Sequence, residues 1–191
     1  SGLVNPSGTH TFSAGLANLN GDYVCTNSPA TISSATVNFN STSAVAVVTF
    51  SSGTLSGSGV LNVLQTMNWT GGFMGGSGRT VIAPGATLNF NNGAAVTLDT
   101  RTLENGGTVI WTGAGNLTAS ATVITNRAGA LFEVRNNATL SPRGFFPWRF
   151  DNAGTFRKMT SGTTTFAAGV SLNNYNTVEI RSGILAANGG Y

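Results

Sequence analysis

The 191 residues are enough for one domain of ordinary size or one continuous repeat array, and charged residues make up only 8 % of them. A hydrophobic share of 40 % excludes intrinsic disorder, which needs low hydrophobicity and high net charge. The formal net charge of +3 comes from few groups of either sign, and no run of like charges or linker divides the chain.

Short apolar runs bounded by Gly, Asn and Ser indicate β-strands, and no segment sustains the 3.6-residue period of a helix. Residues 1–30 contain the only Cys, the only His and two of the five prolines, so we expect a cap or an irregular first rung there. Residues 31–64 alternate between apolar and polar positions, and Gly-rich corners divide residues 69–90. Both segments predict further strands.

The second half of the chain repeats one phrase four times: an apolar residue, a spacer, Asn, a corner, a small residue and an apolar strand. The asparagines of the four copies are Asn105, Asn126, Asn152 and Asn174, at intervals of 21, 26 and 22 residues. A period in this range is typical of solenoids. We therefore predict an all-β fold, a right-handed parallel β-helix with about 22 residues per rung and roughly 7–9 rungs, forming a single domain over residues 1–191.

One such rung is not stable alone, because burial of an aliphatic side chain contributes roughly 1.5–3 kcal/mol and ordering each residue costs about 1–2 kcal/mol. Parallel stacking at a spacing of about 4.8 Å brings the four asparagines into one column. There each side chain bonds to its copies above and below, which makes the column a structural ladder. A ligand-binding role is the alternative.

Residues 141–149 depart from the repeat and coincide with its longest interval, so we expect a loop that bulges from a rung. The segment 142–150 combines four aromatic residues, two arginines and two prolines. Its candidate interaction residues are Arg143, Phe145, Phe146, Trp148 and Arg149. The loop either folds back over the solenoid, contacts a neighbouring subunit, or binds carbohydrate, since exposed apolar clusters mark interaction sites.

Residues with catalytic or metal-binding chemistry are scarce. His10 is the only residue on which a Ser-His-Asp triad could be built, and Cys25 alone forms neither an intrachain disulfide nor a Cys-based zinc site. Glu104 and Asp151 occupy equivalent places in the repeat, which puts them roughly 9.6 Å apart, near the outer limit for an inverting glycosidase. We expect solvated corners at both residues, no enzyme activity, no cofactor and no metal.

The stretch from about Val63 to Gly190 resembles repeats of very large secreted or cell-surface bacterial proteins. The phrases that carry the resemblance are Asn68-Trp69-Thr70-Gly71-Gly72, Val81-Ile82-Ala83-Pro84-Gly85-Ala86-Thr87-Leu88, Phe150-Asp151-Asn152-Ala153-Gly154-Thr155-Phe156-Arg157-Lys158 and Asn176-Thr177-Val178-Glu179-Ile180-Arg181-Ser182-Gly183. Such repeats are similar to the parallel β-helices of adhesins and autotransporter passengers. The resemblance implies an extracellular location and a structural or adhesive role, and it brings no catalytic residue.

The basic residues, eight arginines and one lysine, are scattered over many rungs. Tight nucleic-acid binding needs about six to ten phosphate contacts on one surface, so we expect no nucleic-acid partner and consider weak contact with an acidic polysaccharide instead.

The chain begins at Ser1-Gly2 without a leader, contains no apolar run long enough to span a membrane, and stops at Asn188-Gly189-Gly190-Tyr191 without a charged cap. Uncapped solenoid ends expose strand edges. We therefore expect either continuation in a larger chain or head-to-tail self-association into a homopolymer.

The leading functional hypothesis is a non-enzymatic extracellular protein, a β-solenoid subunit of a surface filament, a fibre or an adhesin stalk. The alternative is a carbohydrate-binding or polysaccharide-degrading β-helix that uses the aromatic and arginine residues of the segment 142–150.

Overall fold

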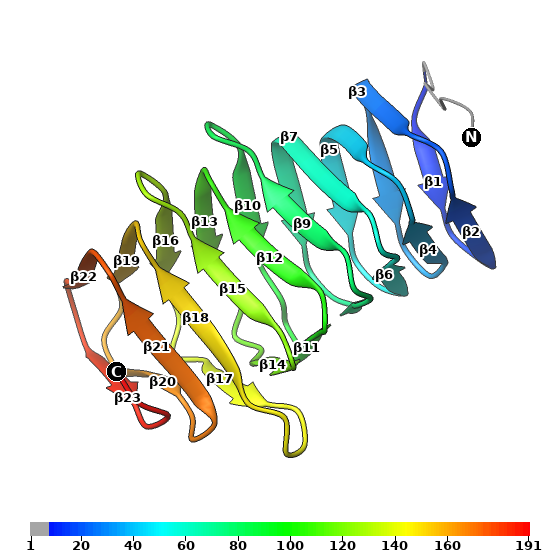
Figure 1. Ribbon diagram of the computed structural model, residues 1–191. Helices are drawn as coiled ribbons and strands as arrows, with labels where there is room; N and C mark the ends of the chain where they lie inside the picture. The colour runs from blue at the N-terminus through cyan, green and yellow to red at the C-terminus, as the bar shows by residue number, and fades with distance from the viewer. Residues whose placement is uncertain (1–7) are drawn as a thin grey trace.

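The computed structural model describes residues 8–191, which form 23 β-strands and no helix. The strands wind into a solenoid of about eight rungs, and Figure 1 shows this solenoid as a long stack that runs from the blue N-terminal end to the red C-terminal end. Each strand pairs in parallel with the equivalent strand one rung away. The predicted all-β parallel β-helix is confirmed.

The solenoid has three sides, which we call faces 1, 2 and 3. Face 1 contains β9 (Arg79–Ile82), β12 (Thr102–Asn105), β15 (Val123–Asn126), β18 (Trp148–Asn152) and β21 (Val170–Asn174). Face 2 contains β1 (His10–Phe12), β10 (Thr87–Phe90), β13 (Thr108–Trp111), β16 (Leu131–Val134), β19 (Thr155–Lys158) and β22 (Thr177–Ile180). Three longer strands, β3 (Tyr23–Ile32), β5 (Ser43–Phe50) and β7 (Val60–Trp69), run through face 1 and then through face 2.

Face 3 is a separate sheet. Within residues 8–191 it consists of nine strands: β2 (Leu16–Leu19), β4 (Thr36–Phe39), β6 (Thr54–Ser56), β8 (Phe73–Met74), β11 (Val96–Asp99), β14 (Leu117–Ser120), β17 (Thr139–Pro142), β20 (Thr163–Phe166) and β23 (Ile184–Ala187).

The corner between faces 1 and 2 changes along the solenoid. In β3 and β5 the chain crosses it inside one strand, with register shifts after Cys25 and Val45. From β9 onward the crossing is a separate corner, as in the segment 105–107 between β12 and β13. The residues that stack at this corner are Cys25, Val45, Val63, Ile82, Asn105, Asn126, Asn152 and Asn174, at intervals of 20, 18, 19, 23, 21, 26 and 22 residues. The early rungs are therefore shorter than the predicted 22 residues.

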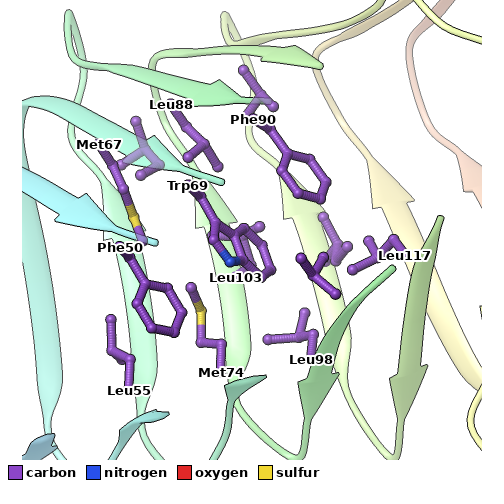
Figure 2. Close-up of a cluster of buried hydrophobic side chains, with 14 of the residues drawn as sticks. Phe50, Leu55, Met67, Trp69, Met74, Leu88, Phe90, Leu98, Leu103 and Leu117 are labelled. Carbon is purple, nitrogen blue, oxygen red and sulfur yellow. The ribbon is translucent and has the colours of Figure 1, made fainter. Parts of the chain in front are cut away.

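The core fills the inside of the solenoid because strand residues alternate between its interior and its surface. In β10, Leu88 and Phe90 are buried whereas Thr87 and Asn89 are partly exposed. Aromatic rings of successive rungs stack at one inner position, and this stack is drawn in part in Figure 2. Its members are Phe50, Trp69, Phe90 and Trp111, with centroid separations of 6.3, 4.6 and 4.9 Å. Offset rings at these distances contribute beyond simple area burial.

The described part of the N-terminal segment already follows the solenoid. His10 pairs in register with Ala30, and Leu16 pairs in register with Thr36. The segment 10–30 thus forms a regular first rung with the short strands β1 and β2 and most of β3, and residues 1–7 lie outside the described residues.

Candidate functional site

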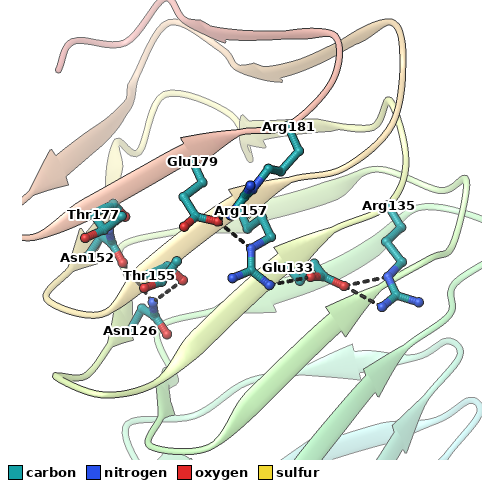
Figure 3. Close-up of polar contacts among 9 residues, drawn as sticks. All are labelled: Asn126, Glu133, Arg135, Asn152, Thr155, Arg157, Thr177, Glu179 and Arg181. Atoms are coloured by element: carbon teal, nitrogen blue, oxygen red, sulfur yellow. Dashed lines mark hydrogen bonds and ion pairs between the residues drawn. The ribbon is translucent and has the colours of Figure 1, made fainter.

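The four repeated asparagines form a hydrogen-bonded ladder inside the corner between faces 1 and 2. The Nδ2 atoms of Asn105, Asn126 and Asn152 each donate to the Oδ1 atom of the next asparagine at 2.8 Å. These three side chains are completely buried, and Figure 3 shows the middle of the column. Every amide donates in the same direction along the solenoid axis.

A second set of bonds ties the ladder to the backbone. Asn126 Nδ2 also donates to the carbonyl oxygen of Thr155 at 3.0 Å, and Asn152 Nδ2 donates to that of Thr177 at 2.8 Å. Asn105 Oδ1 also accepts from the Gly107 amide at 3.1 Å. Because protein groups take both protons of Asn126 and Asn152, the arrangement holds the corner rather than a ligand.

The C-terminal member of the ladder is more open. Asn174 is partly exposed, and its Nδ2 donates to the carbonyl oxygen of Asn176 at 3.1 Å and to the Tyr191 hydroxyl at 3.3 Å. This amide is the donor end of the ladder.

Glu104 and Asp151 lie in one column with Thr125 between them, which puts them two rungs apart as the repeat predicts. Glu104 accepts from Arg79 at 3.1 Å and also binds Arg127. Asp151 accepts from Arg149 at 2.9 Å and from Asn173 at 2.8 Å. Both carboxylates are thus engaged by their neighbours, rather than solvated alone.

A line of alternating charges crosses face 2, as Figure 3 shows. Glu133 binds Arg135 and Arg157, and Glu179 one rung further binds Arg157 at 2.6 Å and Arg181 at 3.2 Å. The hydrogen bond from Arg157, together with that from Arg181, lowers the pKa of the Glu179 carboxyl. The sequence alone predicts arginines scattered over many rungs, but the pairing of β16, β19 and β22 in register brings these residues into one line.

Arg101 is completely buried at a corner between faces 3 and 1. Its guanidinium donates to Thr80 Oγ1 at 2.9 Å and to the carbonyl oxygens of Arg79, Gly57 and Gly59 at 2.9, 3.2 and 3.4 Å. Burial lowers its pKa to about 10. The fork geometry of arginine suits several carbonyl acceptors at once. Arg101 therefore connects three successive rungs at this corner.

Lys158 is a second buried cation. Its Nζ atom donates to the carbonyl oxygens of Thr160 and Asn136 at 2.7 and 3.0 Å, and to Thr160 Oγ1 at 2.6 Å. Burial lowers the pKa of this amine. Lys158 occupies the inner position that Trp111 holds two rungs earlier, with Val134 between them.

The expected interaction loop lies between β17 and β18, and it projects at the lower edge of the solenoid in Figure 1. Trp148, one of the five candidate interaction residues, does not lie on the exposed surface of the loop. Trp148 is only 4 % exposed, because β18 already begins at this residue and its Nε1 donates to the Ser141 carbonyl oxygen at 3.0 Å. The projecting part is reduced to residues 143–147.

The two arginines of the loop are held by carboxylates. Arg143 Nη1 donates to Asp99 at 2.8 Å, and its guanidinium lies over the Phe73 ring at 5.6 Å from the centroid. Arg149 is paired with Asp151. Phe145 is fully exposed and Phe146 is 61 % exposed, so these two rings are the apolar surface that the loop offers.

An open depression of about 350 Å³ lies beside the loop. It is lined by Ala121, Thr122, Val123, Pro147, Trp148, Arg149 and Ser171. The segment 147–149 is common to the loop and the depression, so an apolar projection and a shallow hollow are adjacent on one surface.

The histidine and the cysteine are structural. His10 Nδ1 is 2.9 Å from the Tyr23 hydroxyl, and the Cys25 thiol donates to the Ser28 carbonyl oxygen at 3.0 Å. Tyr23 is buried, which is the main cause of its raised pKa. Among residues 8–191 no three His, Cys, Asp or Glu side chains are grouped so that they could hold a metal ion.

Residues 8–191 contain no helix that is long and apolar enough to cross a membrane. Comparisons with protein-family models, curated proteins and solved structures found no match for the chain. The stacked rungs and the asparagine ladder define the chain as a β-solenoid protein.

Proposed function

We propose that the chain is a non-enzymatic structural protein, a β-solenoid unit of an extracellular surface filament, a fibre or an adhesin stalk. Most of the distinctive polar residues support stacking, because the ladder asparagines, Arg101 and Lys158 each donate at least one hydrogen bond to a neighbouring rung. Resemblance of the repeat phrases to adhesin repeats supports the extracellular location.

The observation that carries the proposal is the open C-terminal rung. Val178 and Leu185 pack against the core but remain partly exposed, and Ile180 and Ile184 are 52 % and 59 % exposed. The strands β22 and β23 also present one free edge each, and unpaired parallel edges recruit further strands. We propose that a further rung covers this edge, supplied either by the continuation of a longer chain or by the N-terminal rung of a second copy. A contact between copies joins unlike ends, so it does not close and it propagates.

The proposal is tested with the variant Ile180→Lys/Ile184→Lys, which places two charges on the exposed end. We expect wild-type protein to form elongated particles whose length grows with concentration, and the variant to stay monomeric in sedimentation velocity and negative-stain imaging. The matched control is Leu64→Lys/Met159→Lys, which adds the same charges at exposed apolar residues of inner rungs. A wild type that stays monomeric at high concentration, or a control variant that disassembles equally, contradicts end-to-end stacking.

A second candidate function is polysaccharide binding by the loop, favoured by the exposed rings of Phe145 and Phe146 beside the depression. The loop has fewer side chains free to contact a sugar than the sequence predicts, because Trp148 is buried and both arginines are paired. Glycan-array binding that is lost in Phe145→Ala/Phe146→Ala supports it, and release of reducing sugar that depends on Glu104 or Asp151 extends it to catalysis.

A further inference from the structure

The loop between β17 and β18 is held in a fixed shape. Arg143 and Phe146 form an antiparallel bridge across its neck, and Gly144 has the positive φ of 66° that the tight reversal requires. The ion pair of Arg143 with Asp99 ties one side of the neck to β11, and the indole bond of Trp148 to Ser141 ties the other side to β17. A preorganised projection loses little conformational entropy when it binds.

The tip of this loop is apolar and exposed. Phe145 has its full side-chain surface in solvent and Phe146 has most of it. A phenyl ring exposed in this way is unfavourable, because apolar surface gains about 25 cal/mol per Å² when it leaves water. Rigid aromatic side chains are also the residues that most often anchor protein interfaces.

The charges around the tip are already compensated. Arg143 is paired with Asp99, and Arg149 is paired with Asp151. Anionic lipid surfaces and polyanions are recognised by unpaired cations, so neither fits this tip. The favoured occupant is a partly apolar hollow without an unpaired charge.

Such a hollow lies on the same molecule, next to the tip. The depression is lined by the apolar residues Val123, Pro147 and Trp148, among others, and by the polar residues Thr122, Arg149 and Ser171. Because projection and hollow are adjacent, a two-fold rotation brings the tip of each copy over the hollow of the other. A surface that is complementary to itself in this way is the requirement for an isologous dimer.

We propose that the loop 143–147 is a lateral self-association site, in which Phe145 and Phe146 of each copy insert into the depression of a second copy. The contact joins solenoids side by side and does not depend on the proposed end-to-end stacking. The hollow of about 350 Å³ accepts one or two rings, so we expect a small contact and a weak dimer.

The experiment measures dimer mass by sedimentation equilibrium in the Ile180→Lys/Ile184→Lys background, where end-to-end stacking is removed. In that background we expect a monomer–dimer equilibrium, and we expect Phe145→Ser/Phe146→Ser to raise its dissociation constant about tenfold or more. The matched control is Leu64→Ser, which removes an exposed apolar side chain at a different corner and leaves the equilibrium unchanged. Circular dichroism checks that each variant keeps its β-structure.

A second variant tests the hollow separately. Ser171→Trp fills the depression but leaves the tip intact, and we expect it to weaken the dimer as strongly as the tip variant. An equimolar mixture of the tip variant with Ser171→Trp restores one of the two insertions, so dimer mass recovers in part. Full dimerisation of Ser171→Trp, or no recovery in the mixture, overturns mutual insertion.

A background variant that is monomeric from micromolar to near-millimolar concentration also overturns the proposal. Loop-dependent retention on a neutral glycan array without any dimer assigns the tip to sugar binding instead, and loop-dependent retention on phosphatidylcholine vesicles assigns it to a lipid surface. Both outcomes leave the result on end-to-end stacking unaffected.

Discussion

Asn126 connects three successive rungs through the hydrogen bonds of its side chain. Its Oδ1 accepts from Asn105 in the preceding rung, and its Nδ2 donates to Asn152 and to the Thr155 carbonyl oxygen in the following rung. All three bonds are made in the interior, where an unmade hydrogen bond is expensive. Bonds in such a chain also polarise one another, which strengthens each of them.

Asn126→Ala is therefore expected to lower the free energy of unfolding by roughly 2–4 kcal/mol, because it leaves buried groups of Asn105 and Asn152 without one partner each. Chemical denaturation followed by circular dichroism measures the change. The control is Asn40→Ala, since Asn40 makes the same 2.8 Å amide bond to Asn20 but in solvent. The control is expected to cost well under 1 kcal/mol. Equal losses in the two variants contradict the role of burial.

At the scale of elements, ion pairs couple the outer surfaces of β16, β19 and β22. Arg157 on β19 bridges Glu133 and Glu179 of the two adjacent strands. Opposite charges in register between neighbouring strands favour this pairing over a shifted one. The line of charges therefore contributes to the register of the last rungs.

The Glu179 carboxyl predicts a dependence of stability on pH. Its folded-state pKa lies below the ordinary 4.5, so the folded state gains stability from the ionised carboxylate above about pH 4.5 and loses it as the pH falls through the lower folded value. We expect Glu179→Gln to lower Tm at neutral pH, and the difference from wild type to shrink toward pH 3. Thermal melts across this range measure it. Asp22→Asn is the control, because it removes a carboxylate that accepts from Ser41 and is paired with no arginine of the described residues, and it keeps an acceptor oxygen. A difference in Tm between wild type and Glu179→Gln that does not change with pH would refute the role of the Glu179 carboxylate.

The elements were predictable where the sequence alternates and where one phrase recurs. Alternation over residues 31–64 predicts strands there, and the repeated asparagine identifies the corner after β12, β15, β18 and β21. The earlier rungs lack this signal because Cys25, Val45, Val63 and Ile82 occupy the corner column. At Cys25, Val45 and Val63 the long strands continue without a separate corner and these rungs are shorter, whereas β9 ends at Ile82 and a separate corner follows.

The residues of the candidate site were harder to predict, because their environment depends on the rungs next to them. Alternation in β19 puts Lys158 on the same side as Phe156, but a lone lysine is expected at the surface until the carbonyl oxygens around it are known. Trp148 was assigned to the loop because residues 141–149 break the repeat. Its pairing with Val170, which makes it the first residue of β18, emerges only from the strand register.

For the whole molecule, contacts run almost entirely between adjacent rungs, so stability is approximately a sum of local terms. Inner rungs have two neighbours, whereas the last rung, β21 to β23, has one described neighbour. Local opening is therefore expected to be easiest at this end.

Hydrogen–deuterium exchange read by mass spectrometry tests this gradient. We expect slow exchange in β10, β13 and β16 and fast exchange in β22 and β23 at low protein concentration. If copies stack end to end, exchange in β22 and β23 slows as the concentration rises, and it stays fast in Ile180→Lys/Ile184→Lys. Uniform exchange rates along the chain would contradict the expectation that stability is a sum of contributions from neighbouring rungs.

The corner ladder also bears on how such a protein changes over generations. The bonds between asparagines join copies one rung apart, and Asn105, Asn126 and Asn152 all donate in the same direction. A duplicated stretch of DNA that encodes one whole rung therefore inserts a matching donor and acceptor, whereas a partial rung breaks the column. Insertions and deletions are therefore expected to comprise whole rungs of about 21 residues. The solenoid can then change in length while every corner keeps the same structure.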